Sequence, residues 1–592
     1  MFSRRALHSK ALQLNAWTPC DLLAAEDQAV VECTTAVVPL CYATACALPD
    51  DRTIQLALRR ISATANTSIP RNVWLIPDRS DVVLPSDAAE QMQQIYHQLG
   101  RNVSIYTLDQ RGTGQSTRLA CNSTSTTADN ATASVDSTLA KLQNCVQGLN
   151  AEYTGDAAVF SVTSAAYDLV TVISQLQRNA EVYVYGQGYG TLLIQRLLHF
   201  GLANIKGYVL DNSVTTSGAP QDHFSYFSKA DATSGRIGDE FIALCENDTE
   251  SCSAQFSRDA SISEALDNVL TRLDNDNATL NDSNCASSLL PLTASSFDLD
   301  DRPSYRLRRA LAMMMVNTTE RVFIPVVTYR IQRCSQRDKI ILQQLFTRLR
   351  ARDESLKRHT ELVYDIQTFS ELWEQPPPTA TACREAIPGT NASGNGSTGF
   401  AYARDKYWNV AATIPAHASV LLLQGALDVQ EKTAALLGAL VGDAKALVTF
   451  DATSHNVISC TGMTYRPSSS SCGLAILRSF EITEAMSLAV LNTTDAYDDI
   501  ESSNSGNTGA TLGPDPSSSR SSSSIPTASP SSSIASSSLK RSRDRYRIAL
   551  IVVSVVLALV RLSEEERKLQ RMRGDEPDDL ELLRQLYFSS PE

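Results

Sequence analysis

The chain has 592 residues, 43% of them hydrophobic, so it is long enough for one large domain with an insertion or for two or three smaller domains. The formal net charge of −13 excludes a nucleic-acid-binding protein, because phosphate binding needs clustered Lys and Arg side chains that the long central region lacks. None of the 13 cysteines forms a C-x-x-C pair, which leaves zinc-ribbon and thioredoxin-like proteins without support. We expect neither a metal nor a cofactor.

Short strands and a helix alternate over the first hundred residues. Strands are predicted at 30–42, 53–61, 72–76 and 103–108, and a helix is predicted to begin with Ser86 as its N-cap and to continue to Leu99. A further helix is predicted over Val162–Leu176, where apolar residues recur at helical spacing. Strands that alternate with helices form a parallel sheet covered on both faces. We therefore predict an α/β fold with a mostly parallel central sheet.

Residues 182–191, VYVYGQGYGT, predict a strand that passes through a glycine turn into a helix. This is the layout of the G-x-S-x-G nucleophile elbow, in which a serine hydroxyl stands above a parallel sheet and the next backbone N–H stabilises an oxyanion. Gly186 and Gly190 occupy the two glycine positions, and Tyr189 supplies the next N–H. Gly188 occupies the serine position, so the residue that should attack has no hydroxyl.

The alternation of strands and helices stops at about residue 215, where helical, Arg-rich runs mix with loops, and this change predicts an inserted helical lid. Strands resume at 419–424 and 446–450, and a helix near 475–491 closes the domain. The predicted divisions are an N-terminal extension at 1–29, the first half of the core at 30–214, the lid at 215–413, the second half of the core at 414–500, a Ser-rich disordered stalk at 501–547, a candidate transmembrane helix at 548–562 and a charged tail at 563–592.

The C-terminal region predicts a stalk and a membrane anchor. Residues 501–547 are rich in Ser, Thr, Pro and Gly and cannot bury enough apolar area to offset chain entropy, which indicates a disordered stalk open to O-glycosylation. Residues 548–560 are apolar or small and span roughly 20 Å as a helix, against about 30 Å for the hydrocarbon core. Flanking arginines and local thinning reduce this gap, so we predict a membrane anchor, with a short buried helix as the alternative.

Cysteines and glycosylation motifs indicate an oxidising compartment. Proximity in the sequence favours pairing of Cys20 with Cys33, Cys41 with Cys46, Cys121 with Cys145, Cys245 with Cys252, and Cys460 with Cys472. The N-x-[ST] acceptor motifs in the same region lie at Asn66, Asn102, Asn122, Asn130, Asn247, Asn277, Asn281, Asn317, Asn391, Asn395 and Asn492. We predict a protein of the secretory pathway, secreted or anchored at the cell surface. Residues 1–15 carry basic residues but lack the apolar stretch of a signal peptide, so either the native start precedes Met1 or the secretory interpretation is wrong; we expect the first.

Four motifs resemble one family. GQGYGTLLIQR at 186–196 resembles the elbow of the α/β-hydrolase serine peptidases of the prolyl aminopeptidase and tripeptidyl aminopeptidase kind. DQRGTGQS at 109–116 is similar to a second signature of that family, LLQGALD at 422–428 to the strand end that carries the catalytic acid, and Ser454-His455 to the histidine loop. The resemblance implies an α/β-hydrolase fold with a helical lid insertion.

The resemblance also implies that Asp428 is the acid and His455 the histidine of a catalytic triad, in the chain order nucleophile, acid, histidine. Two features depart from the family. Gly188 removes the nucleophile. The glycine-rich loop that should supply a second oxyanion N–H is replaced by Pro77, which has no N–H, and by Asp78, whose negative charge opposes an oxyanion.

Three hypotheses about function follow. The first is a catalytically impaired homologue of serine aminopeptidases that binds a peptide, a small molecule or a partner in the cleft under the lid. The second is an active serine-type hydrolase or exopeptidase with a rearranged nucleophile, for which Ser80, Ser213 and Ser454 are the candidates. The third is a cell-surface binding or adhesion protein, suggested by the stalk and the anchor.

Overall fold

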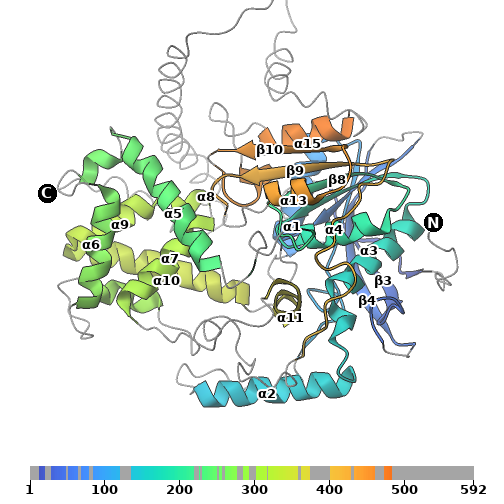
Figure 1. The fold of residues 1–592 in the computed structure, drawn as a ribbon, viewed down its shortest axis with the longest axis horizontal. Helices are drawn as coiled ribbons and strands as arrows, with labels where there is room; N and C mark the ends of the chain where they lie inside the picture. The colour runs from blue at the N-terminus through green and yellow to red at the C-terminus, as the bar shows by residue number, and fades with distance from the viewer. Residues whose placement is uncertain are drawn as a thin grey trace, which may run out of the picture.

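The computed structural model describes residues 12–482 except for 21–28, 48–50, 65–68, 79–84, 121–134, 219–225, 227–229, 250–251, 257–260, 276–284, 293–301, 317, 358–361, 374–399, 429–432, 452 and 461–471. Figure 1 shows a central sheet covered by helices, with a second group of helices beside it. The predicted stalk at 501–547, the candidate transmembrane helix at 548–562 and the tail at 563–592 lie outside the described residues. Within the described ranges, no helix has the length and hydropathy that crossing a membrane requires.

A ten-stranded sheet forms the centre of the protein, in the order β1-β3-β4-β6-β5-β7-β8-β9-β10, with β2 paired to β3. Its strands are β1 Gln13–Leu14, β2 Thr18–Pro19, β3 Glu32–Pro39, β4 Thr53–Ile61, β5 Arg71–Ile76, β6 Ser104–Leu108, β7 Glu181–Gln187, β8 Ile205–Asp211, β9 Ser419–Gly425 and β10 Lys445–Phe450. The strands from β6 to β10 pair in parallel, whereas β4 is antiparallel to both β3 and β6. The predicted, mostly parallel sheet is therefore confirmed.

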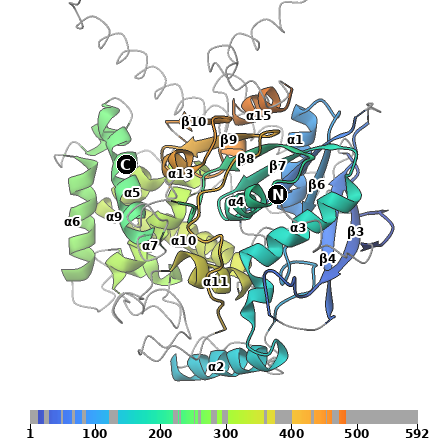
Figure 2. The same cartoon turned by 45° about the vertical axis from the view of Figure 1, so that its right-hand side comes forward.

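Helices cover both faces of this sheet (Figure 2). They are α1 Pro85–Gln98, α3 Val162–Leu176, α4 Gly190–Phe200, α13 Thr433–Ala439, α14 Val457–Cys460 and α15 Cys472–Ile482. Helix α2 Val135–Glu152 lies apart from the sheet, at the foot of the view in Figure 2. In β5, Trp74 and Ile76 belong to the core that packs against α3 and α4. The alternate residues Val73 and Leu75 belong to the core that packs against α1 and α15. Because successive strand side chains point to opposite faces, this alternation buries both sides of the sheet.

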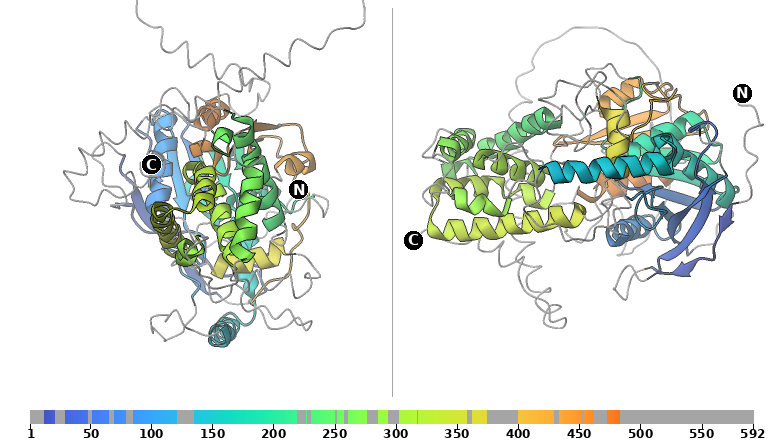
Figure 3. Two further views of the ribbon diagram at one scale, coloured as in Figure 1. Left: turned by 90° about the vertical axis from the view of Figure 1, so that its left-hand side faces the viewer. Right: turned by 90° about the horizontal axis from the view of Figure 1, so that it is seen from below.

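The predicted insertion contains a group of helices with a hydrophobic core of its own. Its helices are α5 Ala230–Asn247, α6 Ile262–Asn275, α7 Pro303–Val316, α8 Thr318–Arg321, α9 Ile324–Arg333, α10 Gln336–Lys357 and α11 Leu362–Gln367, followed by the π-helical turn η6 Thr368–Leu372. Figure 3 shows α5 to α10 packed side by side at one end of the molecule. One residue from outside the insertion, Leu427, joins this core, so the insertion packs next to the loop that follows β9.

Disulfides occur in both the sheet region and the insertion. The predicted pairs Cys20–Cys33, Cys41–Cys46 and Cys245–Cys252 are confirmed, and Cys145 is also disulfide-bonded. The pair Cys285–Cys334 was not predicted, because its two cysteines lie 49 residues apart. The predicted pairing of Cys460 with Cys472 and the residue Cys121 lie outside the residues whose side chains the structure describes. These bonds are consistent with a secreted protein.

Some element boundaries differ from the predictions. The first helix begins at Pro85, so Ser86 lies inside the helix, not at its N-cap. Proline is favourable in the first turn of a helix, where its missing N–H costs nothing. Helix α2 was not predicted, and two of its residues, Cys145 and Leu149, are buried in the core. Its long polar sequence gives a weak helical periodicity, which explains why the sequence analysis missed it.

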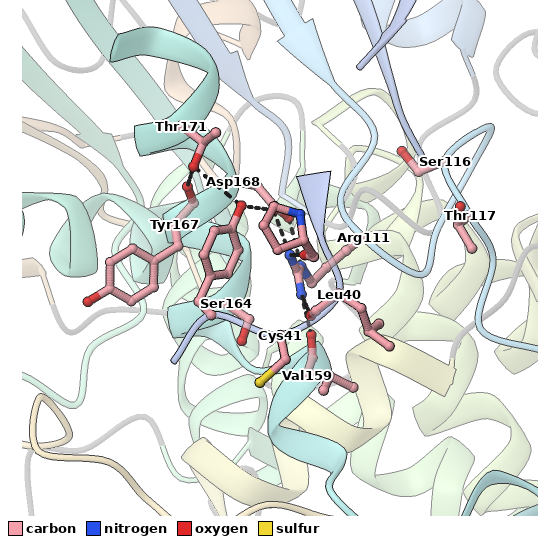
Figure 4. A network of polar contacts seen from close by, with 12 residues as sticks. Leu40, Cys41, Arg111, Ser116, Thr117, Val159, Ser164, Tyr167, Asp168 and Thr171 are labelled. Carbon is pink, nitrogen blue, oxygen red and sulfur yellow. Dashed lines mark hydrogen bonds and ion pairs between the residues drawn. The ribbon is translucent and has the colours of Figure 1, made fainter. Parts of the chain in front are cut away.

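A buried arginine from the DQRG motif ties the sheet to its helices. Arg111 is fully buried, and its guanidinium forms a bidentate pair with Asp168 of α3 at 2.6 and 2.7 Å. Its remaining N–H groups donate to the carbonyls of Pro39, Leu40 and Val159 (Figure 4). All five donors of the guanidinium are therefore used, which is the condition under which a buried charge is tolerated. Arg111 therefore has a structural role: it ties the loop after β6 to α3 and to the segments that contain Leu40 and Val159.

We expect Arg111→Met to lower the free energy of unfolding by about 3–5 kcal/mol, because it leaves the Asp168 carboxylate buried without its partner. Urea unfolding at pH 7 measures this. The matched control is Arg236→Ala, which removes an exposed i,i+4 pair with Glu240 and should change stability by less than about 0.5 kcal/mol. Equal stability losses for the two variants would contradict the structural role of Arg111.

Candidate functional site

The turn between β7 and α4 has the backbone of a nucleophile elbow. Gly188 has a φ of +45°, in the left-handed region that favours glycine, and its N–H donates to the Asp211 carbonyl at 2.9 Å. The flanking glycines are required by close packing. A Cβ on Gly186 would lie 2.7 Å from Cδ1 of Ile194, and a Cβ on Gly190 would lie 2.5 Å from the Ile76 carbonyl oxygen. The elbow therefore fits tightly against the end of β5.

This tight fit brings the loop after β5 onto the elbow. A Cβ on Gly190 would also lie 2.8 Å from the carbonyl oxygen of Pro77, which is buried. The next residue, Asp78, points its carboxylate at the turn, and Oδ1 accepts the Tyr189 N–H at 2.6 Å. That N–H is the donor that the elbow motif uses to stabilise an oxyanion. In this protein the donor already binds a carboxylate.

The Asp78 carboxylate also fills the space that a nucleophile side chain would need. A Cβ built on Gly188 would contact Oδ1 of Asp78, lie 2.6 Å from its Cγ and lie 2.9 Å from Cε1 of His455. Atoms do not approach this closely, so a side chain at position 188 and the observed Asp78 conformation exclude each other. The observed position of the Asp78 side chain therefore requires glycine at 188.

His455 lies between two carboxylates. Its Nε2 is 3.1 Å from Oδ2 of Asp78, and its Nδ1 is 3.5 Å from Oδ1 of Asp428. Asp428 follows β9 and is buried, while His455 follows β10, so two neighbouring parallel strands deliver the pair to the same edge of the sheet. Asp428 and His455, the acid and the histidine that the resemblance implies, therefore lie together, and His455 also lies next to Gly188.

The two carboxylates keep His455 in its charged form. Burial alone would lower the pKa of His455, but Asp78 and Asp428 more than offset it, and the pKa is raised well above 6.5. The carboxylates therefore favour the charged form of the ring, and each ring nitrogen faces one of them. A triad histidine must be neutral to accept a proton from its nucleophile. The two carboxylates beside His455 oppose that neutral form.

A third carboxylate, which the sequence analysis missed, supports the histidine loop. Asp211, at the end of β8, accepts the N–H groups of Val457 and Ile458 at 3.1 and 3.3 Å and the Tyr185 hydroxyl at 2.6 Å. Burial raises the pKa of Asp211 to about 6. Beside it, the Asn212 amide N–H donates to the Ser454 carbonyl at 3.2 Å. The signal in the sequence was an aspartate that ends a buried strand, at the edge where parallel sheets place their sites.

Of the serines considered as replacement nucleophiles, Ser213 and Ser454 lie in the part of the chain that the structure describes. The Ser454 hydroxyl donates to the Val316 carbonyl at 3.4 Å, and Ser213 is fully buried. Ser80 lies outside the described residues. The group that the structure places at Nε2 of His455 is the Asp78 carboxylate. A hydroxyl attack directed by His455 therefore has no support from the described serines.

The end of the insertion contacts the elbow and its helix. The Tyr189 hydroxyl donates to Oε1 of Gln367 in α11, and the Gln367 amide donates to the Phe160 carbonyl at 2.7 Å. Arg196 of α4 pairs with Glu371 at 2.9 Å, and both side chains are buried. These contacts hold residues 362–372 against the elbow and place the site between the sheet and the insertion.

No family model matches this sequence, and no match was found among curated proteins. Among solved structures, the chain is similar to a proline iminopeptidase from Mycobacterium smegmatis, with 12% identity, a TM-score of 0.33 and coverage of 73% of this chain and 96% of that one. It is also similar to an esterase from Exiguobacterium antarcticum, with 11% identity, a TM-score of 0.27 and coverage of 68% and 90%. A hydrolase from Pseudomonas aeruginosa has 13% identity, a TM-score of 0.27 and coverage of 76% and 98%. With its strand order and its elbow after β7, the protein has the α/β-hydrolase fold.

We expect the imidazole of His455 to titrate well above pH 6.5 and Asp78→Asn to lower its pKa. Because the folded pKa exceeds the unfolded value, His455 stabilises the protein below pH 6.5, and this stabilisation is lost as pH rises through the folded pKa. NMR of protein with labelled histidines measures both titrations. His199 is the internal control, since burial lowers its pKa and the substitution should leave it unchanged. An unshifted His455 in the variant would contradict the proposed charge pairing.

Proposed function

We propose that this protein is an α/β-hydrolase-fold homologue of serine aminopeptidases that does not perform serine acyl transfer and instead binds a peptide through its amino terminus. One observation supports the absence of serine acyl transfer. The carboxylate of Asp78 fills the space above Gly188 that a nucleophile would need, and it also accepts the Tyr189 N–H. The motifs at 109–116, 186–196 and 422–428 support the descent from aminopeptidases.

Each step of serine acyl transfer lacks a component. No hydroxyl is present at position 188 to attack a carbonyl carbon. The Tyr189 N–H is bonded to an anion, and Pro77 has no N–H to add. The raised pKa of His455 disfavours the neutral imidazole that would accept the proton. Removal of the nucleophile alone costs serine peptidases on the order of 10⁶ in turnover, so the three changes together leave no route through an acyl-enzyme.

The charge of the site favours a cationic ligand. Asp78, Asp428 and Asp211 outnumber the one imidazolium of His455, and the Asp78 side chain is 28% exposed to solvent. A peptide amino terminus is a cation with three donors, and a partly exposed carboxylate next to a closed site is a suitable acceptor. The position of the site between the sheet and the insertion supports binding under the lid.

The disulfides support a secreted location for this function. Two sequon asparagines lie within the described residues, Asn102 and Asn247, and both are exposed, as glycosylation requires. A membrane anchor at 548–560 remains a prediction from the sequence, together with the cell-surface role that depends on it.

The absence of serine acyl transfer is tested with a fluorophosphonate probe and with aminoacyl-arylamide substrates. We expect no serine to be labelled and no arylamine to be released, by the wild type or by His455→Ala. Release that disappears in His455→Ala would refute the proposal.

For the ligand, isothermal titration with trialanine and with N-acetyl-trialanine should show binding of the first peptide only, and Asp78→Asn should weaken it. Equal binding of both peptides would exclude recognition of the amino terminus.

Restoring the hydroxyl should require two changes. Gly188→Ser alone should lose about 1–3 kcal/mol of stability and stay inert to fluorophosphonate, because its Cβ collides with Asp78. Gly188→Ser with Asp78→Gly should recover stability and react with the probe at the introduced hydroxyl, so we expect a coupling free energy of about 0.5–3 kcal/mol in the double-mutant cycle. Urea unfolding of the two single variants and the double variant measures this coupling. Additive effects would show that the two positions are independent.

A further inference from the structure

We propose that Asp211 is a pH-sensitive switch: its carboxylate fixes the histidine loop, residues 453–458, and its protonation in mild acid loosens the part of this loop that follows His455. The switch goes beyond the proposed peptide binding, because it belongs to the protein without a ligand. It depends on how a buried carboxylate at the end of β8 contacts a loop that lies more than 240 residues further along the chain.

The part of the loop before His455 is held by neutral groups. The Asn212 amide N–H donates to the Ser454 carbonyl at 3.2 Å, and its Oδ1 accepts the Gly425 N–H at 2.9 Å. A Cβ on Gly425 would collide with the carbonyl oxygens of Thr453 and Ser454, so the loop packs directly on the end of β9. None of these groups titrates. This attachment is therefore independent of pH.

The part of the loop after His455 is held by a carboxylate. Oδ1 of Asp211 accepts the Val457 N–H at 3.1 Å, and Oδ2 accepts the Ile458 N–H at 3.3 Å. These N–H groups begin α14, and the first N–H groups of a helix cannot bond within the helix. All three residues are buried. A bond to an ionised acceptor is roughly twice as strong as a neutral one, so this attachment depends on the charge of Asp211.

Asn456 connects the loop to the same carboxylate by a second route. Its φ is +61°, in the left-handed region that few residues other than glycine adopt, and its Oδ1 accepts the Gln187 amide N–H at 2.6 Å. The Gln187 amide also donates to the Tyr185 hydroxyl at 2.7 Å, and that hydroxyl donates to Oδ2 of Asp211 at 2.6 Å. The backbone next to His455 is therefore coupled to the Asp211 carboxylate.

The surroundings of Asp211 place its titration in mild acid. Burial raises the pKa of Asp211 to about 6, while Tyr185, the two loop N–H groups and the charge of His455 act in the opposite direction. Among the described residues, Tyr185 and His455 are the titratable groups that face it, and the adjacent strand β9 carries none. Asp78 and Asp428 lie at the two nitrogens of the imidazole. The raised pKa of His455 favours its charged form throughout this range.

Protonation of Asp211 acts locally. One oxygen becomes a donor, and the bonds that remain lose their charge assistance. Because the folded pKa lies above the ordinary value of 3.8, the folded protein binds this proton more tightly than the unfolded chain does. Asp211 therefore adds to global stability as pH falls through about 6, while its hold on the loop weakens. The expected change is a loosening of residues 455–458 in a folded protein.

Hydrogen–deuterium exchange of the full chain tests the switch. We expect the protection of the Val457 and Ile458 amides, corrected for intrinsic exchange, to fall about 5- to 30-fold from about pH 7 to about pH 5, as a charge-assisted bond becomes neutral. The midpoint should lie at about pH 6. Amides of β9 that pair with β8 are the internal reference and should keep their protection. Constant protection of Val457 and Ile458 over this range would overturn the proposal.

Variants assign the effect to Asp211. Asp211→Asn keeps one carbonyl acceptor and cannot titrate, so its loop amides should have the low protection at neutral pH and show no further fall in acid. Tyr185→Phe removes a donor that favours the carboxylate and should move the midpoint to higher pH. The control Glu240→Gln removes an exposed carboxylate of α5 and should keep the wild-type profile.

A fall in protection that persists in Asp211→Asn would assign the effect to another group and overturn the proposal. Circular dichroism establishes which variants are folded. If Asp211→Asn does not fold, the midpoint of Tyr185→Phe decides, and an unshifted midpoint overturns the proposal. The exchange measurement involves no peptide, so its failure leaves the proposed binding function unaffected, and absence of trialanine binding leaves the switch unaffected.

Discussion

The close contact between the elbow and the loop after β5 is the constraint on which the site depends. Gly190 packs on the carbonyl oxygens of Ile76 and Pro77 at distances that admit no side chain, and Gly186 packs against the start of α4. The contact fixes where the chain continues beyond β5, so Asp78 meets the Tyr189 N–H. The same packing that keeps an elbow in shape therefore delivers a carboxylate to its centre.

The Asp78 carboxylate at the elbow changes the charge of the site, in addition to the loss of a serine hydroxyl at position 188. A serine hydroxyl at the elbow would be neutral and would leave the histidine free to act as a base. The carboxylates of Asp78 and Asp428 lie at the two ring nitrogens of His455 and raise its pKa, which favours the imidazolium. Asp211 and Asn212 hold the histidine loop from below through backbone contacts. The described residues therefore place a carboxylate where the elbow motif has a hydroxyl.

The sheet could be predicted because its strands are short apolar runs separated by helices of clear periodicity. Asp428 and His455 could be selected because each follows a buried strand in a recognisable motif. The sequence also indicated that Asp78 brings negative charge to the oxyanion region, but it could not show that one oxygen meets Tyr189 and the other meets His455, 377 residues away. That geometry depends on packing between segments distant in the chain. The same reason explains why Asp211 and the pair Cys285–Cys334 were missed.

The disulfides determine how the two parts of the protein can move. Among the residues described, Cys20–Cys33 and Cys41–Cys46 lie within the sheet region, while Cys245–Cys252 and Cys285–Cys334 lie within the insertion. Each bond stiffens one part, and none of these four joins the two. The insertion is held over the elbow by noncovalent contacts such as Arg196 with Glu371. Displacement of the insertion relative to the sheet would therefore break noncovalent contacts and none of these four bonds.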